Sequence, residues 1–305
     1  MAARVAGYKP FMADPVHSSS LPLPSEAQQL LATASRFETP CGSGMMVWHT
    51  WGQATRRPGL APLVLLHGGS GSWMHWLRNI PALVDSGRWV LVPDLPGFGD
   101  SAVPPGGSDA DALPEPMEQG LNILVGDAAC DLVGFSFGGM VAGFIAERFA
   151  TRAARVVLVG APGLGVALEK AIRLRAWRHL ADEGARDAIH RHNLAALMLH
   201  HEESITELAL RLHIANVLRD RMKGRSLART DALAQSLARL GCPVYAVYGR
   251  EDALYRGKLD LLQAALESAP DFRGLALIED AGHWVQFERA GAFDKALLAA
   301  LDVGL

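Results

Sequence analysis

The stretch CDLVGFSFGGMVAGFIAERF, residues 130–149, gives the clearest indication of the fold, because an apolar run, a glycine-rich turn and a helix-like segment follow one another directly. The run Cys130–Val133 has the length and composition of a buried strand, and Met140–Phe149 is typical of a helix. Between them, Ser136 stands in the pattern Gly-x-Ser-x-Gly, whose small residues permit a sharp turn that exposes the hydroxyl. The pattern alone also fits an ordinary turn, but the strand before it and the helix after it favour a nucleophilic serine.

Strand-length apolar runs recur along the rest of the chain, and several are followed by helix-like segments. This alternation predicts an α/β fold with a mostly parallel central sheet and helices on both faces. The further runs are Met45–His49, Leu63–Leu66, Trp89–Val92, Val156–Val159, Val244–Val247 and Leu275–Ile278.

One segment, residues 163–240, interrupts the alternation, because it has leucine, alanine and arginine at helical spacing and no convincing strand. It predicts a helical insertion in a core made of residues 34–162 and 241–305. The insertion holds 13 lysines and arginines against 9 acidic residues, whereas the whole chain has a net charge of −3. Residues 1–33 predict a mobile arm and then a short helix over 28–32, capped by Ser25.

The overall composition excludes several classes of protein. Half of the 305 residues are hydrophobic, which favours a large core, and a pI near 6.4 provides no basic field for nucleic acid or a membrane surface. Three widely spaced cysteines fit neither a disulfide framework nor a zinc knuckle. We find no signal peptide or membrane span, so the sequence predicts a cytoplasmic protein, and a homodimer is left open.

A serine nucleophile needs a general base and an acid that orients the base. Two later loops supply them: Asp252 follows the run that ends at Val247, and His283 follows the run that ends at Ile278. Both therefore lie at the carboxyl edge of the sheet, where α/β proteins bind ligands. Taken alone, Asp252 could be a helix cap and His283 a turn residue, but their joint occurrence in this order favours a triad with Ser136.

Two other acids compete with Asp252 for the orienting role. Asp280 is too close in sequence to His283 to reach its far ring nitrogen, and Glu251 is expected to point elsewhere in its turn. Asp252 is therefore the preferred acid.

The glycine-rich loop at residues 67–72 predicts an oxyanion hole, because its backbone amides can face a developing negative charge. The amide of Gly69 is expected to act together with that of Phe137, directly after the nucleophile. A plain glycine-rich turn is the alternative interpretation. A phosphate-binding loop is disfavoured, because no Gly-Lys-Ser/Thr follows.

Five motifs in order resemble the α/β-hydrolase superfamily over about residues 45–301. They are HGGSGS at 67–72, PDLPGFGDS at 93–101, GFSFGG at 134–139, GRED at 249–252 and AGHWVQFE at 281–288. The resemblance implies an α/β-hydrolase fold, with residues 163–240 as a helical lid over the active site.

Within the superfamily, the segment from His283 resembles the meta-cleavage-product hydrolases, which split carbon–carbon bonds in dienones from aromatic degradation. In that branch a tryptophan commonly follows the catalytic histidine, as Trp284 does here, and a lid arginine assists. Arg211 lies in the corresponding region, although the best register places His213 there. Phe135 departs from the branch, which often has asparagine before the nucleophile.

The substrate-binding residues that follow from this interpretation are Ser70, Phe135, Arg211, His213 and Trp284. The first hypothesis is a C–C hydrolase for an apolar small molecule with an anionic group, which the basic insertion would bind. The second is a carboxylesterase or lactonase, which the apolar Phe135 favours. A ligand receptor without turnover is the third, and the intact Ser136, Asp252 and His283 argue against it.

No cofactor or metal is implied by the sequence. His190, His192, His200 and His201 lie in the insertion, but no acidic or cysteine partners stand at metal-site spacing.

Overall fold

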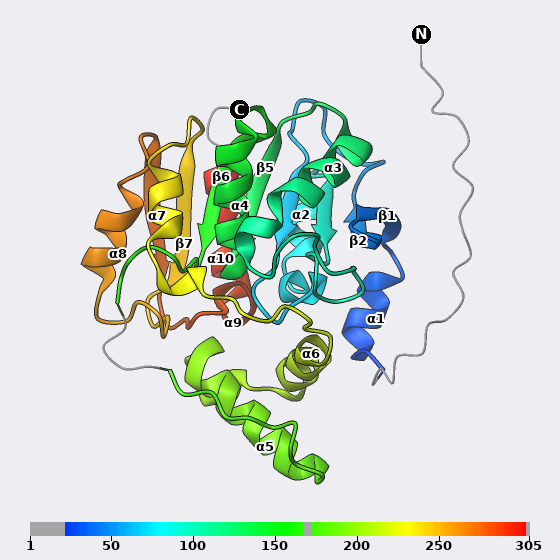
Figure 1. Cartoon of the computed structure of the whole chain (residues 1–305), viewed down its shortest axis with the longest axis vertical. Helices are drawn as coiled ribbons and strands as arrows, with labels where there is room; N and C mark the ends of the chain where they lie inside the picture. Colours follow the sequence, from blue (N-terminus) through cyan, green and yellow to red (C-terminus); the bar gives the residue numbers. More distant parts are fainter. Residues whose placement is uncertain (1–21, 168–171, 303–305) are drawn as a thin grey trace.

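The computed structural model describes residues 22–167 and 172–302, and one eight-stranded sheet lies at its centre (Figure 1). The strand order is β1-β2-β4-β3-β5-β6-β7-β8. Strand β2 is antiparallel to both its neighbours, and all pairs from β4 to β8 are parallel. The strands are β1 (Ser35–Cys41), β2 (Gly44–Trp51), β3 (Leu63–Leu66), β4 (Val90–Pro93), β5 (Cys130–Phe135), β6 (Ala153–Val159), β7 (Val244–Gly249) and β8 (Phe272–Ile278). The predicted mostly parallel sheet and its seven predicted strands are confirmed.

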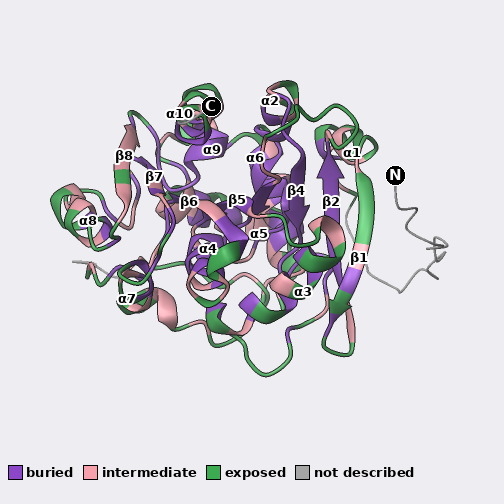
Figure 2. Cartoon of the chain, turned by 90° about the horizontal axis from the view of Figure 1, so that it is seen from above, coloured by how far each residue is buried: buried purple, intermediate pink, exposed green. Residues whose placement is uncertain are grey.

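Helices cover both faces of the sheet (Figure 2). One face carries α2 (Ile80–Asp85), α9 (Val285–Glu288) and α10 (Ala290–Leu301), and the other carries α3 (Pro114–Val125), α4 (Phe137–Arg148), α7 (Ala232–Leu237) and α8 (Leu259–Leu266). Because side chains alternate along a strand, the buried residues form two clusters, with Leu132 in one and Val133 in the other. Short 3-10 turns join these elements: η1 (Trp73–Trp76), η2 (Ala110–Ala112) and η3 (Ala150–Arg152).

Strand β1 was not predicted. It lies at the edge of the sheet and pairs only with β2, and its first three residues are exposed. An edge strand with one solvated face carries few apolar residues, so it lacks the continuous apolar run that marked the others. A two-residue loop at Gly42 and Ser43 connects it to β2, and the φ of +58° at Gly42 favours glycine there.

Helix α1 (Ser25–Leu31) is the short helix expected near the N-terminus, but the predicted cap is wrong. Ser25 is the first helical residue, and its hydroxyl donates to the Glu26 carboxylate instead of accepting a backbone N–H. The part of the expected arm before residue 22 lies outside the described residues.

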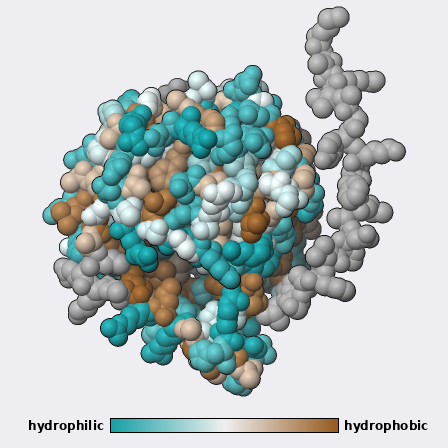
Figure 3. All heavy atoms as spheres, viewed as in Figure 1, coloured by the Kyte–Doolittle hydropathy of each residue, from teal (hydrophilic) through white to brown (hydrophobic). Residues whose placement is uncertain are grey.

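Between β6 and β7, the described residues contain helices and no strand. They are α5 (Glu183–Asn193), the π-helical turn η4 (Leu194–Met198), η5 (Glu202–Ser204), α6 (Glu207–Leu218), η6 (Leu227–Arg229) and α7. Helices α5 and α6 lie beyond the carboxyl edge of the sheet, whereas α7 packs against α4 (Figure 1). The surface is hollowed between the sheet and these helices, with apolar atoms around the hollow (Figure 3).

Side-chain caps fix where the two outer helices begin. The Asp182 carboxylate accepts the Ala185 amide at 2.7 Å, and the Thr206 hydroxyl accepts the Ala209 amide at 3.2 Å. Each cap satisfies a donor that the first helical turn leaves free. None of the helices in the described ranges combines the length and apolarity that crossing a membrane requires.

Candidate active site

Ser136 stands between β5 and α4, at the sharp turn that the glycine pattern predicts. Its backbone has φ 50° and ψ −118°, a conformation that costs a non-glycine residue about 1–3 kcal/mol. The flanking glycines permit this turn, because a Cβ on Gly134 would lie 2.3 Å from the Gly138 carbonyl oxygen. The hydroxyl is thereby held at the carboxyl edge of the sheet.

Two hydrogen bonds connect Ser136, His283 and Asp252. The Ser136 Oγ lies 2.9 Å from His283 Nε2, and His283 Nδ1 lies 2.9 Å from Asp252 Oδ2. His283 and Asp252 are almost completely buried. The backbone amide of Leu254 donates to the other carboxylate oxygen of Asp252 at 2.9 Å, which fixes the carboxylate further.

The two competing acids do not take part in this arrangement. Among the described residues, neither Glu251 nor Asp280 makes a hydrogen bond to His283, and the exposed Asp280 occupies a turn with φ 53°. The structure therefore brings together the three residues that the sequence selected.

The loop after β3 lies against this group. A Cβ on Gly68 would lie 3.2 Å from the Ser136 Cβ, and one on Gly69 would lie 3.7 Å from the Phe137 Cβ. Neither the Gly69 amide nor the Phe137 amide has an acceptor within the part of the chain that the structure describes. Two free N–H groups beside a serine hydroxyl are suited to binding a developing oxyanion.

A buried histidine supports the same loop. The Gly68 amide donates to His75 Nδ1 at 3.2 Å, so the neutral ring carries its proton on Nε2. Burial, followed by the neighbouring histidines, lowers the pKa of His75 well below 6.5, which keeps the ring neutral. His75 was not predicted from the sequence, because its role depends on a hydrogen bond from the Gly68 amide that no sequence motif indicates.

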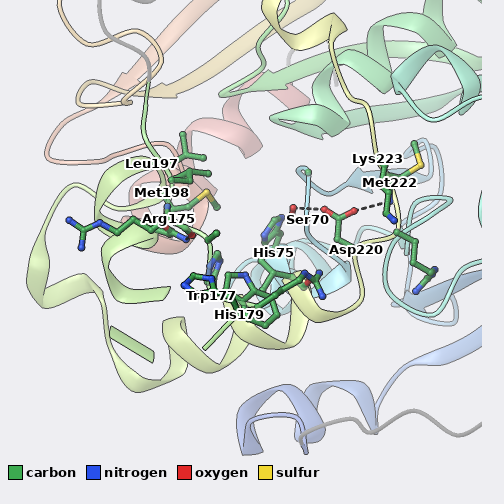
Figure 4. Close-up of a pocket in the computed structure, with 18 residues that line it drawn as sticks. Ser70, His75, Arg175, Trp177, His179, Leu197, Met198, Asp220, Met222 and Lys223 are labelled. Carbon is green, nitrogen blue, oxygen red and sulfur yellow. Dashed lines mark hydrogen bonds between the residues drawn. The ribbon is translucent and has the colours of Figure 1, made fainter. Parts of the chain in front are cut away.

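A cavity of about 1080 Å³ opens between this loop and the insertion (Figure 4). Gly69, Ser70 and His75 form its wall on the side of the sheet, whereas Ser136 is not among the lining residues. The insertion contributes apolar and basic side chains, among them Leu174, Arg175, Trp177, Arg178, Leu197, Met198, His213, Val217, Met222 and Lys223. The cavity thus combines an apolar wall with several cations.

Two of the predicted substrate contacts lie elsewhere. Phe135 is fully buried with its ring centroid 5.0 Å from that of His283, so it packs behind the histidine and not at the cavity wall. Trp284 is also buried, stacks on Phe287 and donates its indole N–H to the His75 carbonyl at 3.1 Å. Phe135 therefore packs against His283, and Trp284 holds His75 in place.

The structure does not bring Arg211 to this cavity. Its guanidinium pairs with Glu207 at 2.7 Å and Asp187 at 3.0 Å, and it lines a separate cavity of about 250 Å³ between α5 and α6. The Glu207–Arg211 pair has the i,i+4 spacing that stabilises an exposed helix face. The predicted role of Arg211 as the partner of a substrate anion is not supported by this position.

His213 does line the main cavity, but it is not a cation. Burial, followed by the neighbouring His190, lowers the pKa of His213 to about 3. A neutral imidazole can donate one hydrogen bond to a substrate, but it does not neutralise a carboxylate.

The lowered pKa of His213 should make the free energy of unfolding depend on pH. The unfolded chain binds a proton at His213 as the pH falls through 6.5, whereas the folded chain does so only near pH 3. Between these values, the free energy of unfolding therefore falls by up to about 1.4 kcal/mol for each unit by which the pH is lowered. His213→Phe should therefore lose less stability on acidification than the wild type. Urea unfolding at about pH 7.5 and about pH 5 measures the difference. Equal losses would mean that His213 is protonated in the folded chain.

The parts of the chain that the structure describes contain no cluster of three or more histidine, cysteine or acidic side chains arranged to hold a metal. All three cysteines are buried free thiols.

Comparison with known proteins places the chain in a family. A model described as the alpha/beta hydrolase family matches residues 63–296, so the chain belongs to the α/β hydrolases and is an enzyme of the hydrolase class. A 2-hydroxy-6-oxo-6-phenylhexa-2,4-dienoate hydrolase from Burkholderia cepacia is 26% identical over 254 residues, which cover 79% of this chain and 88% of the relative.

Solved structures show the same fold. A serine hydrolase from the polyaromatic-hydrocarbon-degrading bacterium Cycloclasticus zankles has a TM-score of 0.70 and 21% identity, covering 88% of this chain and 98% of its own. A putative aryl esterase from Burkholderia cenocepacia has a TM-score of 0.67 and 21% identity, with the same coverage. At this identity the likeness shows the fold alone.

Proposed function

We propose that the chain is a serine hydrolase in which Ser136 attacks a substrate carbonyl and His283 accepts the serine proton at Nε2. This proposal is supported by two hydrogen bonds, each 2.9 Å long, that connect Ser136 to His283 and His283 to Asp252. The Asp252 carboxylate holds the proton on Nδ1 and stabilises the imidazolium that forms. The protonated His283 then donates the proton to the leaving group, and water repeats the sequence to release the acyl part.

The amides of Gly69 and Phe137 form the oxyanion hole in this proposal. Neither amide has an acceptor among the described residues, and the Cβ position of Gly69 lies 3.7 Å from the Phe137 Cβ. Phe137 follows Ser136 and is the first residue of α4, where the helix N-terminus adds partial positive charge. One such donor contributes about 3 kcal/mol of transition-state stabilisation.

For the substrate, we propose a dienone acid that is cleaved at a carbon–carbon bond. The similarity to the dienoate hydrolase of Burkholderia cepacia and the mixed apolar and basic lining of the cavity support this choice. Among the described residues, Arg175, Arg178 and Lys223 form no ion pair with an acid, so their charges are available to a substrate carboxylate. A carboxylesterase is the second candidate, since a carboxylic ester needs no chemistry beyond the same three residues.

We further propose that residues 163–240 act as a lid on a core of residues 34–162 and 241–305. The insertion supplies most of the cavity wall, and its segment at Met198 is fastened to the core by the Trp284 amide, which donates to the Met198 carbonyl at 2.7 Å. The remainder of the cavity wall comes from Gly69, Ser70 and His75 of the core.

A substrate comparison tests the choice of substrate. Ring-fission dienone acids and neutral p-nitrophenyl esters should both be assayed with the double variant Arg175→Gln/Arg178→Gln. Loss of charge-assisted contacts of about 1.5–3 kcal/mol predicts that kcat/KM for the dienone falls about 10-fold or more, while the neutral ester is nearly unaffected.

Arg211→Gln is the matched control, because it removes a cation of the same insertion from the separate cavity. It should leave the ratio of the two activities unchanged. No dienone turnover by the wild type, with ester turnover intact, would favour the carboxylesterase.

A further inference from the structure

Arg225, in the connection between α6 and η6, is held in place from the core. The Asp109 carboxylate accepts the amides of Ser226 at 2.5 Å and Leu227 at 2.9 Å, which fixes the backbone directly after the arginine. Gly224, directly before it, has a φ of +86°, which favours glycine there. The contacts with Asp109 therefore hold the backbone next to Arg225 in place.

The guanidinium itself is fixed on one side by polar partners. Nη2 donates to Asp220 Oδ2 at 2.8 Å and to the Ser70 hydroxyl at 3.2 Å. Ser70 in turn donates to the same Asp220 oxygen at 2.5 Å, and the Met222 amide donates to Asp220 Oδ1 at 2.9 Å (Figure 4). This network connects the insertion to the loop that contains Gly69.

Two aromatic rings border the guanidinium from the core. Its Cζ lies 5.3 Å from the ring centroid of Phe98 and 5.8 Å from that of Phe137. Stacking on aromatic faces stabilises a desolvated guanidinium and restricts its orientation.

Of the other two guanidinium nitrogens, Nη1 has no partner in the described parts of the chain. It is buried, and no acceptor lies within hydrogen-bond distance among the described residues. It lies 2.9 Å from the position that a Cβ would occupy on Gly69, and that position is 3.7 Å from the Phe137 Cβ. A buried donor without a partner costs about 1–3 kcal/mol, and a charged donor costs more. A group that supplies an acceptor here removes this cost and therefore binds more tightly.

We infer that Arg225 donates a third hydrogen bond to the oxyanion that forms on attack by Ser136. The inference rests on the proposed serine-hydrolase function and adds a charged donor to the amides of Gly69 and Phe137. The guanidinium keeps its protons throughout, so Arg225 stabilises charge and transfers no proton. A substrate carboxylate is the less suitable partner, because Nη1 lies against Gly69, whose amide belongs to the proposed oxyanion hole.

The first test uses Arg225→Met, which keeps the length of the side chain and removes its charge and donors. With p-nitrophenyl acetate, kcat should fall about 100-fold and KM should stay within about twofold, because the lost contact exists only in the transition state. Phenylboronic acid, which forms an anionic tetrahedral adduct with an active-site serine, should bind about 100-fold more weakly. Arg229→Gln removes an exposed cation four residues away and should change neither value.

Gly69→Ala supplies a second variant, because its Cβ would displace Arg225 Nη1 and leave the backbone amide in the chain. It should weaken boronate binding, and the double variant Gly69→Ala/Arg225→Met should be little worse than either single variant. Full additivity, or unchanged kcat and boronate affinity in Arg225→Met, would overturn the third donor. A loss confined to carboxylate-bearing substrates would assign Arg225 to ground-state binding and overturn it as well.

Labelling of Ser136 by a fluorophosphonate separates this inference from the proposed function. If wild-type Ser136 is labelled and Arg225→Met behaves as wild type, only the inference fails. If wild-type Ser136 is not labelled and esters are not hydrolysed, the proposed function fails and the inference fails with it.

Discussion

Ser136→Ala is expected to lower kcat on the order of 10⁶-fold while the protein keeps its fold, because the proposed covalent route depends on this one hydroxyl. The Ser136 Oγ makes its hydrogen bond to His283 and contributes little to packing, and its side chain is partly exposed. Steady-state turnover of the best substrate measures the loss, and circular dichroism with a thermal scan measures the fold.

Ser268→Ala is the matched control, because Ser268 is exposed and its hydroxyl makes only a 3.3 Å bond to the Ala234 carbonyl. It should retain full activity. If Ser136→Ala kept a substantial part of the activity with its fold intact, another group would have to be the nucleophile.

Asp252→Asn is expected to lower kcat on the order of 10⁴-fold, since the amide of asparagine offers an N–H where His283 Nδ1 needs an acceptor. The wrong tautomer would then place a proton on Nε2, toward Ser136, and the ring would no longer serve as a base. The fully buried Asp252 has no solvent to replace the lost acceptor. The rate of turnover and the rate of fluorophosphonate labelling should fall together.

Glu251→Gln is the control for Asp252→Asn, because it changes the neighbouring acid in the same turn. Its effect should be small, since among the described residues no hydrogen bond joins Glu251 to His283. A larger loss in Glu251→Gln than in Asp252→Asn would mean that the orienting acid is misassigned.

The sheet was predictable because its central strands are buried on both faces, which produces continuous apolar runs such as Leu63–Leu66 and Val156–Val159. The edge strand β1 was not predictable, because one of its faces is exposed to solvent and the strand therefore has no continuous apolar run. The positions of Ser136, Asp252 and His283 were also predictable, since parallel strands place the loops that follow them at one edge.

The charged residues of the insertion were not predictable in the same way. Arg211 lies in the region where the resemblance implies a lid arginine, although the best register places His213 there. The acids one turn away on α6 and across on α5 hold its guanidinium away from the main cavity, and only the Glu207 spacing was visible in the sequence. Arg225 reaches the predicted oxyanion loop because Asp109, 117 positions before Ser226, accepts the backbone amide of Ser226. No local sequence pattern indicates such a contact, so the role of Arg225 could be inferred only from the tertiary structure.

The assignment of Ser136 as the nucleophile can be tested by mass spectrometry of the wild-type protein after reaction with a fluorophosphonate, which modifies activated serines. We expect one adduct per chain on the peptide that contains Ser136, formed together with loss of turnover and much more slowly in Asp252→Asn. An adduct on a different residue, or full turnover with Ser136 unmodified, would contradict this assignment.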